Sequence, residues 1–402
     1  MNADFHSALK AAAEAIDRRQ TESAQIFHHN DADGLSCAAI VSTALLRKGI
    51  DFQRCCLEKP YPEVLHQVFK QEGRLLIFAD FAGRIAPWIA ALNRGRNLVL
   101  ILDHHACQPV EASGLHHLNP ELYGMKGDRD ISASTVCYRF VRELDPRNVD
   151  LAHLAVVGAV GDRFFESGRL TGENRRALLD ARDQGTIDID KEELKEAYLY
   201  AGAGKRMPVK LIVEMIETLG AAGYYQGGPE LGIECLVDGF SHRARERFNS
   251  LESLKVSAFN RMVKRLQAGH LNQSNSIQWF HAGDEFMPMG VKIIGVFCQY
   301  IRRMDFVDAH KYIVGFQRLP DEVPGFGHVK FNADKISMRA PPQLAARIRK
   351  GQQPGMDTFF PQATNLLGGF SDGCHSLAAA TTLGRGKEVA LIQTMESLLE
   401  KG

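Results

Sequence analysis

Acidic side chains and histidines stand at the ends of several apolar stretches of this sequence. They occur in the segments HHNDADG (28–34), FAD (78–80), LDHH (102–105) and GAVGD (158–162). Carboxylates with a minority of imidazoles, and no thiolates, suit Mn²⁺ and to a lesser degree Mg²⁺. The recurring pattern therefore predicts a site for two divalent ions. In chain order, its candidate residues are His29, Asp31, Asp33, Asp80, Asp103, His104, His105 and Asp162.

The spacing of these residues favours phosphoryl chemistry. Asp31 and Asp33 alternate in an extended turn, so they can reach two different ions about 3.5–4 Å apart, and an acid between the ions would bridge them. Such a pair of ions activates a water that attacks phosphorus in line. Gly34 lets the backbone approach closely, and the amino terminus of the helix that follows favours a phosphate.

Each residue alone has a simpler interpretation. Asp80 alone is most often a helix cap, and Asp162 alone is most often a loop residue. His28 points opposite to His29 if the strand continues, which indicates a structural neighbour. The pair at 116–117 shows nothing beyond adjacency. Only the joint pattern predicts a metal site.

The elements that must position these residues alternate along the first part of the chain. Between 24 and 120, apolar stretches such as AQIFHH, RLLIFADF and NLVLILDHH alternate with helical patterns such as GLSCAAIVSTALLRKG. This alternation predicts a parallel sheet with helices on both faces, a doubly wound α/β domain. In such sheets the ligand crevice lies at the carboxyl ends of the strands, where the acids and histidines occur.

The remainder divides into a helical part and a second strand-rich part. Residues 131–220 are predicted to be mostly helical, and a charged helix is expected at about 241–268. From about 276 the pattern predicts strands at SIQWFHA, VKIIGVFCQYI, KYIVGFQRL and HVKFNADKISMRA, before the end returns to helix with a glycine-rich passage. The predicted domains are a metal-binding domain at 1–190, a helical connecting segment at 191–275 and a second α/β domain at 276–402.

The composition limits the class of protein. The 402 residues are 45% hydrophobic and 24% charged, and 48 basic side chains balance 48 acidic ones. A protein that coats long duplex DNA carries a basic excess, so nucleic-acid contact here should be local and suited to short or single-stranded pieces. None of the eight cysteines forms a CxxC pair. We see no signal peptide and no 18-residue apolar stretch, so we predict a cytoplasmic protein that does not contact a membrane.

Taken in order, HNDADG, FAD, LDHH and GAVGD resemble the DHH phosphoesterase superfamily over roughly residues 24–180. The resemblance implies that six residues hold two Mn²⁺ (or Mg²⁺) ions. It also implies that His105 acts on the substrate phosphate, and that Asp103 orients the histidines. The six implied metal ligands are His29, Asp31, Asp33, Asp80, His104 and Asp162.

The carboxyl-terminal part resembles the DHHA1 substrate domain through HVKFNADKISMRA and LLGGFSDGCHSLAAATT. This resemblance implies a smaller α/β domain across a cleft from the metals. Arg339 and His375 would hold a terminal phosphate or nucleotide, and Gly368 and Gly369 would allow close backbone approach. The family usually has GGH, whereas His375 here follows Gly369 by six residues. A buried capping histidine is the alternative interpretation of His375.

These patterns predict a Mn²⁺-dependent phosphodiesterase that hydrolyses short oligonucleotides, or linear or cyclic dinucleotides, by two-metal water activation. Two alternatives are a RecJ-like single-strand-specific exonuclease and a pyrophosphatase or exopolyphosphatase. A degenerate, inactive scaffold is disfavoured because every expected ligand is present. The predicted partners are a short single-stranded nucleic acid or a dinucleotide as substrate, and a second copy of the chain in a possible homodimer.

Overall fold

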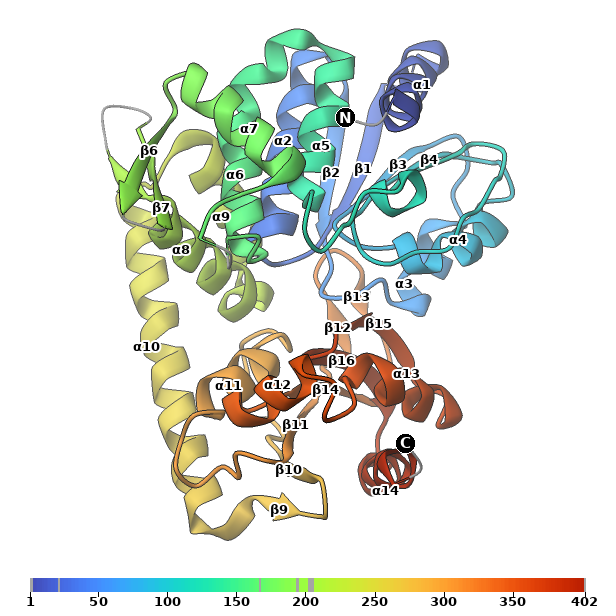
Figure 1. Cartoon of the computed structure of the whole chain (residues 1–402). Helices are drawn as coiled ribbons and strands as arrows, with labels where there is room; N and C mark the ends of the chain where they lie inside the picture. The colour runs from blue at the N-terminus through green and yellow to red at the C-terminus, as the bar shows by residue number, and fades with distance from the viewer. Residues whose placement is uncertain (1–2, 21, 166–167, 193–194, 202–205, 401–402) are drawn as a thin grey trace. The chain divides into compact units, whose positions relative to one another are not determined.

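The computed structural model describes residues 3–20, 22–165, 168–192, 195–201 and 206–400. The chain forms two compact units, residues 1–249 and residues 250–402 (Figure 1). No helix in the described part of the chain has both the length and the apolar character needed to cross a bilayer.

A five-stranded parallel sheet forms the centre of the first unit, with strand order β2-β1-β3-β4-β5. Every residue of β3 and β4 is buried, as expected for strands covered on both faces. The strands are β1 (Ser23–His28), β2 (Asp51–Cys56), β3 (Leu75–Ala79), β4 (Leu98–Leu102) and β5 (Leu115–Leu118).

Helices cover both faces of this sheet, as the alternating pattern predicted. The chain moves from β1 to β2 through α2 (Ala32–Arg47), and then reverses direction through α3 (Pro62–Val68) and α4 (Ala86–Asn93). Because crossovers between parallel strands are right-handed, this reversal puts α2 on one face and α3 and α4 on the other. The reversal lies between β1 and β3, so the sheet has its topological switch point there.

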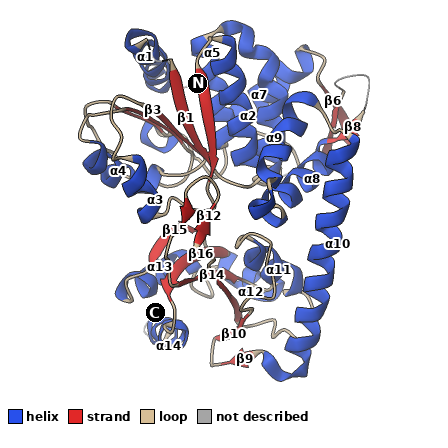
Figure 2. Cartoon of the chain, turned by 180° about the vertical axis from the view of Figure 1, so that it is seen from behind, coloured by secondary structure: helices blue, strands red, loops and turns tan. Residues whose placement is uncertain are grey.

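Further helices pack beside α2 in the same unit. Both α5 and α6 contact α2, and α8 and α9 contact α2 in turn (Figure 2). The remaining helices up to the boundary between the units are α1 (Ala3–Arg19), α5 (Ala133–Leu144), α6 (Ala152–Gly161), α7 (Gly172–Asp183), α8 (Val209–Ala222) and α9 (Gly228–Asp238).

The predicted domain boundaries at 190/191 and 275/276 stay predictions, and the two compact units meet at 249/250. The first unit extends beyond the predicted boundary at 190 because α8 and α9 pack on α2. The predicted charged helix is present as α10 (His242–Arg265). The region predicted to be mostly helical also contains a small antiparallel sheet that the sequence did not indicate, made of β6 (Ile187–Glu192), β7 (Lys195–Tyr200) and β8 (Met207–Pro208).

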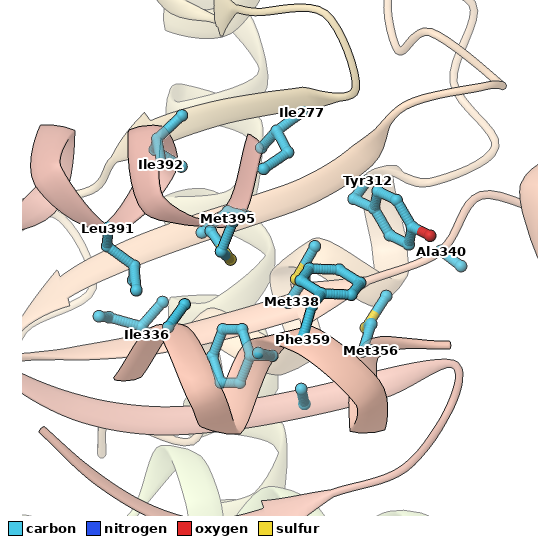
Figure 3. Packing of buried hydrophobic residues seen from close by; sticks show 14 of the residues in the cluster. Ile277, Tyr312, Ile336, Met338, Ala340, Met356, Phe359, Leu391, Ile392 and Met395 are labelled. Atoms are coloured by element: carbon cyan, nitrogen blue, oxygen red, sulfur yellow. The ribbon is translucent and has the colours of Figure 1, made fainter. Parts of the chain in front are cut away.

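A six-stranded mixed sheet with order β15-β16-β14-β11-β10-β9 forms the second unit. Ile336 and Met338 on one face pack against Phe359 and Met395 from the covering helices (Figure 3). The strands are β9 (Asn272–Gln273), β10 (Ile277–His281), β11 (Tyr312–Arg318), β14 (Ala333–Arg339), β15 (Phe370–Cys374) and β16 (Ala378–Gly384). The helices over this face are α12 (Pro342–Arg349), α13 (Met356–Leu366) and α14 (Glu388–Leu399), and a separate short pair joins β12 (Glu322–Val323) to β13 (Gly327–His328).

Two elements of the second unit differ from the prediction. VKIIGVFCQYI, predicted as a strand, contains helix α11 (Ile293–Ile301), because a short apolar stretch does not by itself separate a buried helix from a strand. Its buried residues Ile293, Phe297 and Ile301 recur every four positions, which is the helical period. The glycine-rich passage forms the antiparallel strands β15 and β16 rather than a helix.

Gly158 allows α6 to pack closely against α2 and α5. A Cβ atom at this position would lie 2.2 Å from Ser134 Oγ and 2.3 Å from Asp33 Oδ1. Asp33 belongs to the first turn of α2 and Ser134 to that of α5, so three helices meet at this glycine.

Gly158→Ala should lower the free energy of unfolding of the first unit by about 1–2 kcal/mol. Overpacking a core costs roughly 1–3 kcal/mol, and the helix propensity of alanine offsets up to about 1 kcal/mol of that. The two tryptophans make this measurable by urea denaturation, because a Trp279→Phe background leaves Trp88 of α4 as the fluorescent probe of the first unit.

The matched control is Gly232→Ala in α9, where the nearest atom to an added Cβ is the flexible Leu35 Cδ1 at 3.1 Å. This control should keep or raise stability. An equal loss in both variants would show that the contact at Gly158 is not the cause.

Candidate metal centre

The topology of the first sheet brings the predicted residues to one edge. His29 follows β1, Asp80 follows β3, and Asp103 follows β4, so all three stand at the carboxyl ends of neighbouring strands. The edge between β1 and β3 is the switch point, where flanking connections diverge and leave room for a ligand. Asp162 joins this edge from the carboxyl end of α6.

One group consists of His29, Asp31 and Asp80. Nδ1 of His29 lies 2.7 Å from Asp31 Oδ2 and 3.6 Å from Asp80 Oδ2. Asp31 also caps α2, because its Oδ1 accepts a hydrogen bond from the Gly34 backbone N–H at 3.0 Å. Gly34 is required here, since a Cβ would lie 2.5 Å from the His29 carbonyl oxygen. The close approach predicted for this glycine is therefore an approach to the chain's own backbone.

A second group consists of Asp33, His104 and Asp162. Nε2 of His104 lies 3.4 Å from Asp162 Oδ2. Nδ1 of the same ring lies 2.6 Å from the Gly127 carbonyl oxygen, which can only accept, so Nδ1 carries the proton. The lone pair of Nε2 therefore faces the carboxylates, and this buried atom has no hydrogen-bond partner in the described residues. A backbone carbonyl behind a ring in this way is the usual support of a metal-ligating histidine.

Asp80 connects the two groups. Its Oδ2 faces His29, and its Oδ1 lies 3.7 Å from His104 Nε2. The residue has φ of 66°, in the left-handed region where aspartate and asparagine are tolerated better than other non-glycine residues. Its two oxygens thus point to the two groups, which is the position expected of a bridging carboxylate.

Burial makes the carboxylates of the centre repel one another. Burial, and then the charges of Asp31 and Asp33, raise the pKa of Asp80 well above its ordinary value. Burial and the charge of Asp162 raise the pKa of Asp33 to about 6. Asp33 is held in place nonetheless, because it accepts hydrogen bonds from the backbone N–H groups of residues 133 and 134 at the start of α5.

Asp103 and His105 form a hydrogen-bonded pair, and ligand-type atoms of both residues lie within 4.8 Å of those of Asp80 and His104. Asp103 Oδ1 lies 2.7 Å from His105 Nδ1, and Asp103 Oδ2 accepts a hydrogen bond from the Gly83 N–H at 2.7 Å. Burial favours the neutral form of both residues. The charge and hydrogen bond of the partner outweigh it, so the pKa of Asp103 lies well below its usual range and that of His105 rises to about 9. The carboxylate of Asp103 therefore fixes two groups, the backbone at Gly83 and the ring of His105.

These donors fit a divalent cation. Three ligand-type atoms converge within 4.8 Å of one another in the group of His29, Asp31 and Asp80, and again in the group of Asp33, His104 and Asp162. Oxygen and imidazole donors without thiolates match Mn²⁺ or Mg²⁺. A cation would also offset the repulsion between carboxylates that are 1–3% exposed, such as Asp33 and Asp80.

The predicted substrate residues of the second unit lie in two separate places. Arg339 pairs with residue 378 in the sheet, and the carbonyl of residue 378 accepts a hydrogen bond from the His375 N–H, so these two residues share one end of β16. His375 is exposed, so its alternative interpretation as a buried cap is wrong. Gly368 and Gly369 precede β15, roughly 15 Å away along the strand.

Gly369 nonetheless needs to be glycine, for a reason inside the fold. A Cβ there would lie 2.7 Å from Thr364 Cγ2 and 2.9 Å from the Thr382 carbonyl oxygen. Gly368 has φ of 71°, which glycine adopts readily. Both glycines therefore have structural roles in the turn between α13 and β15.

Sequence reasoning missed the groups that support the centre from a distance. Gly127 holds His104 across 23 positions, and a Cβ on it would lie 1.7 Å from the His104 carbonyl oxygen. Glu217 of α8 lies 3.4 Å from the Ala32 N–H at the start of α2. Neither residue belongs to a motif with a recognisable spacing, so only an alignment of related chains could have indicated them.

Asp80→Asn should abolish stabilisation by Mn²⁺ while making the metal-free protein more stable. Asparagine keeps the preference for positive φ but removes a buried charge next to Asp31 and Asp33. At a Mn²⁺ concentration a hundredfold above the dissociation constant, the wild type should gain about 2.7 kcal/mol. Thermal unfolding at neutral pH, with Mn²⁺ and with chelator, measures both effects.

Asp80→Ala is the comparison that isolates the backbone effect. It also removes the charge but places alanine at positive φ, so it should be less stable than Asp80→Asn by about 1 kcal/mol. A normal Mn²⁺ response in Asp80→Asn would rule out Asp80 as a ligand.

Comparison with solved structures supports the architecture. RecJ from Thermus thermophilus in complex with Mn²⁺ aligns with a TM-score of 0.65 at 16% identity, over 98% of this chain and 55% of that chain. An exonuclease RecJ bound to manganese aligns with a TM-score of 0.60 at 15% identity, over 98% of this chain and 95% of that chain. At these identities the similarity concerns the fold.

The sequence comparisons match part of the chain. An uncharacterized protein of Methanocaldococcus jannaschii is 31% identical over 180 residues, which are 43% of this chain and 40% of the relative. The chain thus matches less than half the length of that relative. The family model described as the DHH family, N-terminal domain, matches residues 23–159. That span contains the predicted segments HNDADG, FAD and LDHH, and it lies within the unit that holds the parallel sheet. Residues 23–159 therefore form a DHH family N-terminal domain.

Proposed function

We propose that this protein is a metal-dependent phosphoesterase that hydrolyses phosphodiester bonds in short oligonucleotides or in linear or cyclic dinucleotides. One observation carries the proposal. Two groups of carboxylates and histidines lie at the switch point of the sheet, Asp80 of the first group faces His104 of the second, and His104 Nε2 has no hydrogen-bond partner in the described part of the chain.

In this proposal six residues hold two Mn²⁺ (or Mg²⁺) ions: His29, Asp31, Asp33, Asp80, His104 and Asp162. When bound, such ions lower the pKa of a water and offset charge on the phosphoryl oxygens. Asp80 would be a ligand common to both sites, because its two oxygens face His29 and His104. Gly127 keeps His104 in the tautomer that can bind a metal.

His105 is proposed to contact the substrate phosphate, and Asp103 to position His105. The His105 side chain is 31% exposed, whereas that of Asp103 is 1% exposed, so a substrate can reach only the imidazole. The pair with Asp103 favours the protonated ring, which suits contact with a phosphoryl oxygen. Asp103 is not expected to contact the substrate, since both of its carboxylate oxygens accept hydrogen bonds within the protein.

Short substrates are favoured by the balanced charge of the chain, 48 basic against 48 acidic side chains. We propose that Arg339 and His375, which share one end of β16, hold the free end of the substrate. The predicted contribution of Gly368 and Gly369 is not retained, because these residues lie at the other end of β15. The DHHA1-like character of the second unit, its placement across a cleft, the homodimer and the cytoplasmic location stay predictions.

A RecJ-like single-strand exonuclease is the second candidate. It is favoured by one observation, the similarity of fold to RecJ over 98% of this chain. A pyrophosphatase or exopolyphosphatase is a third candidate, because the same metal chemistry cleaves phosphoanhydrides.

The experiment that separates these candidates is a substrate panel with Mn²⁺. We expect the purified protein to cleave 5′-labelled dinucleotides or cyclic di-AMP faster than a 20-mer of RNA or DNA and faster than tripolyphosphate. Asp80→Asn should lower each activity by at least about a hundredfold, because a shared ligand is lost. Preferred, processive digestion of the 20-mer would support the exonuclease, and preferred cleavage of tripolyphosphate would support the third candidate.

His105→Ala should keep bound Mn²⁺ and lose turnover by about 10²–10⁴-fold, in the range of a lost acid–base or phosphate-contacting group. Elemental analysis of the dialysed protein measures the metal, and initial rates on the best substrate of the panel measure the turnover. His116→Ala, a partly buried histidine on β5, is the matched control and should retain both. Loss of metal from His105→Ala would make His105 a ligand and contradict the proposed role.

A further inference from the structure

Asp162 is the most exposed of the six proposed metal ligands. The Asp162 side chain is 37% exposed, whereas those of Asp80 and His104 are 3% and 6% exposed. Asp162 ends α6. The residues directly after Asp162 therefore stand beside the most exposed of the proposed metal ligands.

A pocket of about 200 Å³ lies beside the end of α6. It is lined by Val160, Arg163, Phe165, Lys210 and Val213, which come from the end of α6, the segment after it and the start of α8. Pockets for whole small molecules are usually about 300–1,000 Å³, so this one has room for part of a substrate only. Its walls are valine and phenylalanine side chains, and its charged groups are both cations.

Lys210 is held in a defined position. Its Nζ lies 4.7 Å from the centroid of the Phe165 ring, within the range of a cation–π contact. Phe165 is itself fixed by an edge contact with Tyr198, with ring centroids 5.2 Å apart. The face of Phe165 toward Lys210 is thus occupied by a cation, so Phe165 acts as a support for Lys210 rather than as a platform for a base.

Arg163 supplies the second cation. It has φ of 65°, in the left-handed region, and it directly follows Asp162. Arg163 and Lys210 belong to no ion pair among the residues that the structure describes. Two such cations in a small, partly apolar pocket favour a multiply charged oxyanion, which guanidinium groups bind with two parallel hydrogen bonds.

We propose that this Arg163–Lys210 pocket binds a phosphate of the substrate next to the one that is cleaved. The inference rests on the proposed function and names one of its substrate subsites. It implies that the enzyme prefers a dinucleotide with a phosphate at one particular end over one without it. The alternative is that the two cations only offset the negative charge of the neighbouring carboxylates, and in that case they would not distinguish between substrates.

The test compares three dinucleotides with Mn²⁺: one without an end phosphate, one with a 5′-phosphate and one with a 3′-phosphate. We expect the wild type to show a lower KM for one of the phosphorylated forms. Arg163→Gln and Lys210→Met should each raise that KM by about tenfold or more, as for a lost charge-assisted hydrogen bond, and the double variant should show no preference. Phe165→Leu should reduce the preference as well, because Lys210 loses its support.

Two variants control for charge and backbone. Arg94→Gln removes an exposed arginine that also has positive φ, 50°, at the end of α4, and Lys70→Met removes an exposed lysine. Both should keep the wild-type preference. An equal change of KM or kcat on all three dinucleotides in the Arg163 and Lys210 variants would overturn the proposal and support charge compensation.

A binding measurement separates failure of the proposed function from failure of the pocket proposal. If the wild type hydrolyses none of the three dinucleotides, their equilibrium binding, measured by fluorescence anisotropy with labelled forms, still decides about the pocket. Tighter binding of one phosphorylated form that is lost in the double variant would support it. Equal affinities for all three forms in the wild type would refute it.

Discussion

Repulsion between buried carboxylates is the constraint on which the first unit depends. Asp33 and Asp80 are 1% and 3% exposed, and the charges of neighbouring carboxylates add to burial in raising the pKa of each. A buried charge without a partner is among the most costly features that a fold can contain. Protons or cations at this edge of the sheet would offset the repulsion, and the oxygen and imidazole donors of the scaffold fit a cation.

The surrounding elements hold these charges by backbone groups rather than by arginine or lysine. Asp33 accepts N–H groups at the start of α5, Asp103 accepts the Gly83 N–H, and His104 donates to the Gly127 carbonyl. Backbone donors and acceptors orient a side chain without adding a neutralising charge. These contacts fix the side-chain rotamers, so the ligand atoms of the two groups stay directed toward one another, where a metal would bind.

Cations occur beside Asp162, the most exposed of the proposed metal ligands. Arg163 follows Asp162 directly, and Lys210 lies over Phe165 in the same pocket. His105, whose partner Asp103 raises its pKa to about 9, is the third positive group near the centre. Acidic groups in the centre and basic groups beside Asp162 would suit the anionic substrate of the proposed function.

The sequence was sufficient for local features and insufficient for distant contacts. Alternating apolar stretches and helices determined the parallel sheet, and the residues at the strand ends determined which groups meet at its edge, because carboxyl ends of parallel strands share one side. The short apolar stretch at α11 was misleading, because its length and apolar character do not separate a buried helix from a strand. Only the tertiary structure decided how those groups work together. It directed the two oxygens of Asp80 toward different histidines, selected the tautomer of His104 through Gly127, and separated Gly368 and Gly369 from Arg339. It also brought Lys210 over Phe165, two residues that are far apart in the chain. Such contacts join residues tens of positions apart, and no local periodicity or motif spacing encodes them, because they depend on how whole helices pack against the sheet.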